Sequence, residues 1–181
     1  RYAEMGYVAC FEPAMLPGNA RQAHLEMADT PMVDKGAYAL LGNDDFYLRA
    51  LAAGRDPAYI RDYVAWTLNA AQALAIKVVN PGGINAFKFN QRQLDLDEKN
   101  SHYGVSPRDI LLSLAQAVQQ LGLAHPLHIH GCNLGVPGNL ATTLETIHGL
   151  EGLRAHLTHV QFHSYGTEGD YKFSSGAAEI A

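Results

Sequence analysis

Apolar residues in the middle of this chain recur first at helical spacing and then in short continuous runs. Asp56 and Pro57 open the first helical segment, because Asp caps a helix well and Pro fits its first turn. The run Ala75–Val79 follows and ends at the turn sequence Asn80-Pro81-Gly82-Gly83, which predicts a buried strand. The apolar stripe of the preceding helix consists of Ile60, Val64, Leu68 and Ala71.

The same alternation occurs twice more. Ser106 and Pro107 open a second helix that ends at Gly122, and a strand is predicted at Leu127–His130. A third helix, over residues 140–150, precedes a strand predicted at residues 157–162. Helices that connect successive strands by short links make those strands parallel, so the pattern predicts an α/β fold with a parallel sheet.

The rest of the chain is less regular. Residues 45–53 are predicted to be helical, the first fifty residues otherwise show no clear period, and residues 84–105 are predicted to be a polar insertion over a barrel mouth. The chain has 181 residues and begins at Arg1 rather than Met. A closed (β/α)8 barrel needs about 250 residues. We therefore expect residues 1–181 to be an internal fragment of a single, partial (β/α)8 TIM-type barrel domain.

Composition narrows the class of protein. The apolar fraction of 48% is ample for a core, and the net charge of −5 with no long basic cluster argues against nucleic acid as a partner. No apolar run approaches the roughly 20 residues of a membrane span. Cys10 and Cys132 are far apart in the sequence, which is typical of a protein of the reducing cytoplasm.

Ionisable residues stand near the ends of three successive predicted strands. Lys77 interrupts an apolar run, where a lysine is costly without a partner or a task. His128 and His130 are two residues apart, so on a strand both point to the same face, and His159 and His163 follow on the next predicted strand. Because parallel barrels carry their functional groups at the carboxyl ends of strands, and imidazole suits zinc, this pattern favours a metal site.

Each of these residues also has an ordinary interpretation. Buried histidines are often satisfied members of a core, and spacing alone leaves that alternative open for His128 and His130. A lysine ammonium has no lone pair, so Lys77 would bind a metal only after its amine has formed a carbamate with carbon dioxide. We expect His156 to point away from the site and Cys132 to be a small buried thiol.

Five blocks of sequence stand out: residues 34–43 (DKGAYALLGN), 76–83 (IKVVNPGG), 128–139 (HIHGCNLGVPGN), 142–146 (TTLET) and 156–166 (HLTHVQFHSYG). In this order they resemble the A subunits of formylmethanofuran dehydrogenase and of its bacterial relative, the formyltransferase/hydrolase complex. The resemblance implies the amidohydrolase superfamily, a β/α barrel with two divalent metal ions that are usually zinc.

The resemblance also implies a ligand set. Lys77 would be the carbamate that bridges the two metals, His130 the fifth-strand ligand and His159 the sixth-strand ligand, while His128 competes with His130 for its role. The superfamily's first-strand His-x-His pair and eighth-strand aspartate, the general base, have no match in residues 1–181, as an internal fragment requires.

Two further residues would line the substrate pocket: Asn133 would bind the substrate, and His163 would assist catalysis. The strand spacing places His163 too far along the chain from His159 for the two to share a metal.

The implied activity is chemistry at an N-formyl amide. Hydrolysis, or the reverse condensation, would interconvert formyl-methanofuran or formyl-methylofuran with formate and the free furan-methylamine cofactor, in the one-carbon metabolism of methylotrophs or methanogens. The implied partners are the other subunits of a hetero-oligomeric complex. An alternative enzyme is a dihydropyrimidinase-like cyclic amidohydrolase, which shares the metal site but lacks the block around Lys35–Tyr38. A different class is a non-catalytic barrel subunit that only scaffolds its partners.

Overall fold

The computed structural model describes residues 1–81 and 95–181. Within them the strands form one sheet in the order β1-β2-β3-β4-β5, and every neighbouring pair is parallel. Parallel neighbours need a crossover connection between them, so the chain is an α/β structure of repeated strand–helix units, as the sequence predicted. The strands are β1 (Ala9–Met15), β2 (Asp34–Leu40), β3 (Ala75–Val79), β4 (Leu127–His130) and β5 (Ala155–Leu157).

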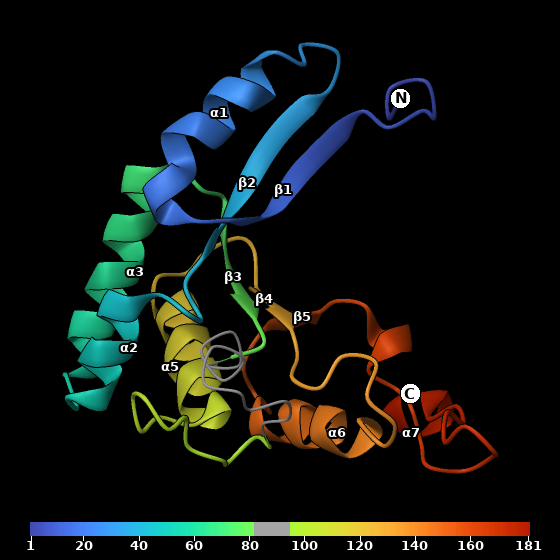
Figure 1. Ribbon diagram of the computed structural model, residues 1–181. Helices are drawn as coiled ribbons and strands as arrows, with labels where there is room; N and C mark the ends of the chain where they lie inside the picture. The colour runs from blue at the N-terminus through green and yellow to red at the C-terminus, as the bar shows by residue number, and fades with distance from the viewer. Residues whose placement is uncertain (82–94) are drawn as a thin grey trace.

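The crossover helices begin where the capping residues predicted. Asp56 Oδ1 accepts a hydrogen bond from the Ala58 amide, and Ser106 forms a reciprocal capping box with Asp109. Figure 1 shows α1, α3 and α5 along the same side of the sheet. The helices are α1 (Ala20–Ala28), α2 (Asp45–Ala52), α3 (Pro57–Ala71), α5 (Pro107–Gln120), α6 (Leu140–Gly149) and α7 (Ala177–Ile180), with short 3-10 helices η1 (Pro17–Asn19) and η2 (Val160–Phe162).

Sequence patterns failed at two places. The first fifty residues contain β1, α1 and β2, which periodicity did not reveal. In β2 three of the four buried residues are small, Gly36, Ala37 and Ala39, and only Leu40 is large, so the strand shows no clear apolar run. The strand predicted at residues 157–162 is wrong, because β5 ends at Leu157 and a 3-10 helix begins at Val160. His159 between them has a φ of 55°, a left-handed conformation that a strand does not contain.

The predicted polar insertion lies partly outside the described residues. Residues 84–94 fall outside them, while residues 95–105 form turns without a helix or strand, as predicted. None of the helices in the described ranges combines the length and apolar character that a membrane-spanning segment requires.

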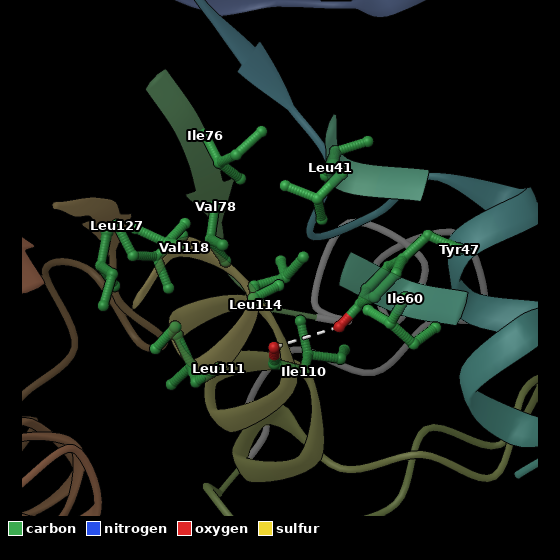
Figure 2. Close-up of a cluster of buried hydrophobic side chains, with 14 of the residues drawn as sticks. Leu41, Tyr47, Ile60, Ile76, Val78, Ile110, Leu111, Leu114, Val118 and Leu127 are labelled. Carbon is green, nitrogen blue, oxygen red and sulfur yellow. Dashed lines mark hydrogen bonds between the residues drawn. The ribbon is translucent and has the colours of Figure 1, made fainter. Parts of the chain in front are cut away.

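The main core lies between the sheet and the helices α2, α3 and α5 (Figure 2). Ile76 and Val78 of β3 and Leu127 and Ile129 of β4 are fully buried in it. The buried Tyr47 hydroxyl donates to the Ile110 carbonyl at 3.1 Å, a bond drawn as the dashed line in Figure 2, and it also bonds to the Ser113 hydroxyl. A buried hydroxyl needs such partners, so Tyr47 fits the core without an unsatisfied polar group.

Candidate functional site

The ionisable residues of β3 and β4 lie on the face of the sheet that points away from the helices. Lys77 is the register partner of His128, and Val79 is the partner of His130. Partners in neighbouring strands point to the same face, and side chains two residues apart do so as well. Lys77, His128 and His130 therefore share one face, opposite the apolar residues that pack on α3 and α5.

Lys77 is buried, with 3% of its surface exposed. Its Nζ shares a hydrogen bond of 2.7 Å with His128 Nδ1 and donates to Thr158 Oγ1 at 3.4 Å. No carboxylate in the described part of the chain forms an ion pair with it. Burial lowers the pKa of Lys77 to about 8, because a desolvated ammonium without a counter-charge is unfavourable.

His128, which bonds Lys77, lies between the rings of Tyr38 and His156. Its ring stacks on His156 with centroids 4.6 Å apart and lies 5.0 Å from the Tyr38 ring. Burial, and then the nearby Lys77 charge, lower the pKa of His128 to about 4, so its imidazole is neutral at pH 7. The expectation that His156 points away from the site is wrong, because His156 is the register partner of His128 and shares its face.

Three histidines gather at the end of β4. The His130 ring centroid lies 5.2 Å from that of His159 and 5.4 Å from that of His163, edge to face in both cases. Burial, followed by the His163 and His159 charges, lowers the pKa of His130 to about 4. The neutral imidazole that results is the form that binds a metal.

The structure overturns the strand argument for His163. An extended strand would have carried His163 away from His159, but the left-handed turn at His159 and η2 reverse the chain and return His163 to His130. The His163 ring is buried, with the residue 4% exposed, and lies against Gly131, where a Cβ would sit 3.6 Å from the ring's Cε1.

The environment of His163 leaves its ring nitrogens unused. Within the described residues neither Nδ1 nor Nε2 has a partner with hydrogen-bond geometry. Burial, and then the His159 charge, lower the pKa of His163, while the adjacent Cys132 backbone partly offsets this effect. Buried ring nitrogens without a partner are rare in native proteins, and a bound water, ion or ligand is one way to satisfy them.

The loop after β4 contains the other predicted residues. Asn133 has a φ of 60° and donates from Nδ2 to Thr142 Oγ1 at 3.2 Å, so its side chain is anchored to α6. Cys132 is buried as predicted, and burial raises the pKa of its thiol to about 12, which makes it a poor nucleophile at neutral pH.

The residues fit a zinc-type metal in chemistry, as a partial donor set. Burial lowers the pKa values of His130 and His163, the ring nitrogens of His163 have no hydrogen-bond partner in the described residues, and the Lys77 amine lacks a carboxylate partner there. No group of three His, Cys, Asp or Glu side chains within residues 1–81 and 95–181 is close enough to hold a metal ion. The histidines of the described residues therefore do not form a complete metal site by themselves.

Sequence reasoning missed two residues of this site. Thr158 accepts from Lys77 and donates to the Ile129 carbonyl at 3.0 Å, which joins β3 to β4 and β5. Asn139 stands directly before α6, and its side chain reaches the loop that carries His163. The sequence shows both residues, but it does not show their hydrogen-bond partners, which lie in distant segments.

Fold and site together define a parallel α/β protein with a buried lysine and a histidine cluster on one face of its sheet. No family model matches the chain. Two curated relatives do. One is the A subunit of the formyltransferase/hydrolase complex Fhc of Methylorubrum extorquens, 44% identical over 165 residues, which are 91% of this chain and 30% of that protein. The other is protein FwdA of Methanocaldococcus jannaschii, 42% identical over 192 residues, across 100% of this chain and 34% of that protein.

A solved structure agrees with these relatives. The crystal structure of the formyltransferase/hydrolase complex (FhcABCD) from Methylorubrum extorquens with methylofuran matches with a TM-score of 0.94 and 43% identity. The match covers 99% of this chain and 33% of that one, so the chain spans about a third of the length of its relatives. The resemblance seen in the sequence blocks is confirmed: over nearly its whole length the chain is homologous to one segment of these proteins.

Proposed function

We propose that this chain is part of the A subunit of a cytoplasmic, hetero-oligomeric complex that acts on the N-formyl amide of a formylated furan cofactor. In this proposal residues 1–181 form one contiguous part of a single (β/α)8 barrel of the amidohydrolase superfamily. The observation that carries it is the position of Lys77 and the histidine cluster on one face of a sheet that superimposes, at a TM-score of 0.94, on a chain of a complex that contains methylofuran.

Lys77, as a carbamate, and the imidazoles of His130 and His159 would hold two divalent metal ions, with zinc as the expected ion. His128, bonded to the lysine amine at 2.7 Å, would orient Lys77 or share in binding. When bound, such ions supply an activated water and a Lewis acid for the amide carbonyl.

In the hydrolytic direction the reaction is balanced by one water. A C–O bond forms at the formyl carbon, the C–N bond breaks, and the amine leaves with a proton while formate is released. His163 would donate a hydrogen bond to the formyl oxygen or transfer a proton there, because its ring nitrogens have no partner in the described chain. Asn133, at the loop that follows His130, would contact the furan-methylamine part of the substrate. The same groups serve condensation in reverse.

The test uses the complete protein in its complex. We expect about two metal ions per catalytic chain by elemental analysis, and formate release from formyl-methylofuran or formyl-methanofuran. A cyclic-amide hydrolase would instead open dihydropyrimidines with the same metal content. A scaffold protein would bind no metal and turn over neither substrate, and that result would refute the proposal.

A further inference from the structure

Asn139 occupies the N-cap position of α6 but does not cap that helix. Asparagine is among the best N-cap residues because its side-chain oxygen accepts from an amide of the first turn, yet this bond is absent here. The backbone of Asn139 has φ −65° and ψ −10°, a helical conformation rather than the extended one that a capping residue usually adopts. The side chain is nevertheless buried, with 2% of the residue exposed.

The side-chain amide of Asn139 forms hydrogen bonds with two loops. Its Nδ2 donates to the Asn133 carbonyl at 2.9 Å and to the Phe162 carbonyl at 2.7 Å. Its Oδ1 accepts from the Tyr165 amide at 2.9 Å. Asparagine suits this position because two donors and one acceptor are needed on a short side chain, whereas aspartate has no donor and leucine has neither.

Thr143, within α6, also binds the loop that carries His163. Thr143 Oγ1 donates to the His163 carbonyl at 2.7 Å, and both residues are buried. Asn139 and Thr143 together therefore hold the backbone at residues 162, 163 and 165 from one end of α6. The Gly135 amide adds a bond to the Phe162 carbonyl at 2.9 Å.

These bonds matter because the sheet no longer holds the chain at this point. β5 ends at Leu157, so strand pairing fixes neither His159 nor His163, and the loop after His130 is equally outside the ladder. Contacts outside the strand ladder, those of α6 among them, therefore hold the His163 ring at its distance from the His130 ring, 5.4 Å in this structure.

We propose that Asn139, assisted by Thr143, is a positioning residue that clamps the loop after His130 to the loop that carries His159 and His163. The inference rests on the proposed function for its catalytic consequence but not for its geometry. Groups that orient the ligands of a metal site commonly change metal affinity or activity by about 10–100-fold when they are removed.

The decisive variant is Asn139→Asp in the complete protein within its complex. It has nearly the same shape, keeps the acceptor for Tyr165, and turns an oxygen toward the carbonyls of Asn133 and Phe162. We expect kcat for formate release to fall about 10–100-fold with a smaller change in KM, and the visible spectrum of the cobalt-substituted protein to change. Asn69→Asp is the matched control, because Asn69 is an exposed amide on α3 that bonds its own helix, and we expect it to behave as the wild type.

A pair at Thr143 keeps the test valid if Asn139→Asp fails to fold. Thr143→Ser retains the hydroxyl and is expected to remain within about twofold of the wild type, while Thr143→Val, which has a similar shape, is expected to lose activity and alter the cobalt spectrum. Wild-type kcat and an unchanged spectrum in Thr143→Val, and in Asn139→Asp if that variant folds, would overturn the clamp.

A metal-free readout separates this inference from the proposed function. If the wild-type protein binds no metal and releases no formate, the proposed function fails, but the clamp is still tested by crystal structures of the metal-free proteins. We expect the His130 and His163 rings to move apart in Asn139→Asp. A separation that stays at 5.4 Å in the variant would refute the positioning role.

Discussion

On β3 and β4, the side chains that face the helices differ in kind from those that face away, although they alternate along the same backbone. Toward the helices lie Ile76, Val78 and their neighbours, fully buried in a continuous apolar core. On the opposite face Lys77 and His128 have no ion pair with a carboxylate of the described residues, and burial lowers the pKa values of both. The first face can only stabilise the fold, whereas the second carries unfavourable desolvation that a ligand or a covalent change would relieve.

The sharpest test of this comparison is Lys77→Ala in the complete protein. If Lys77 carries the proposed bridging carbamate, we expect metal content and formate release to fall to background in this variant, with some recovery when short-chain carboxylic acids occupy the carbamate's place. Elemental analysis and a formate assay measure the two effects. Lys35→Ala on β2 is the control, since Lys35 bonds a loop carbonyl near the start of its strand. Full activity in the Lys77 variant would end the carbamate hypothesis.

His163→Ala tests the cluster of His130, His159 and His163. We expect the metal to be retained and kcat to fall about 10²–10⁴-fold, the range for loss of an acid–base group. His148→Ala, an exposed histidine in the last turn of α6, is expected to leave kcat unchanged. If His163→Ala loses a metal ion while His159→Ala keeps both, the assignments of the two histidines must be exchanged.

Leu114→Ala perturbs only the helix-facing side. Leu114 is fully buried on α5, so we expect the free energy of unfolding to fall by about 2–5 kcal/mol. Metal content per folded molecule should not change, because the residue lies in the core on the other side of the sheet. Chemical denaturation measures the loss, and Leu25→Ala, at an exposed position of α1, should cost less than about 0.5 kcal/mol. A loss of metal in Leu114→Ala would show that the two faces are not independent.

Tyr47→Phe gives the smallest expected effect. It removes one hydroxyl that bonds the Ile110 carbonyl and Ser113 and leaves the ring in the core, so we expect a loss of about 1 kcal/mol in unfolding free energy and no change in kcat. Tyr59→Phe on the exposed side of α3 serves as the control. Equal stability of the Tyr47 variant and the wild type would show that the buried hydroxyl contributes nothing.

Local signals in the sequence determined much of the architecture. The caps at Asp56 and Ser106, the helical stripes behind them, and the apolar runs of β3 and β4 are short-range features, so they predicted the helices and the parallel sheet. The shared face of Lys77, His128 and His130 also follows from residue spacing along strands and from their pairing. Where these signals were weak, as in β1 and β2, the sequence did not reveal the elements.

Only the tertiary structure decided how the histidines meet. The left-handed turn at His159 reverses the chain, and Asn139 and Thr143 then hold His163 against His130 through bonds to residues about 20 or more positions away. Period-two alternation could not predict this, because it applies only while a strand stays paired, and β5 ends two residues before His159. The sequence by itself determined which residue types are available to the site. Their distances depend on contacts between loops, and no local pattern along the chain encodes such contacts.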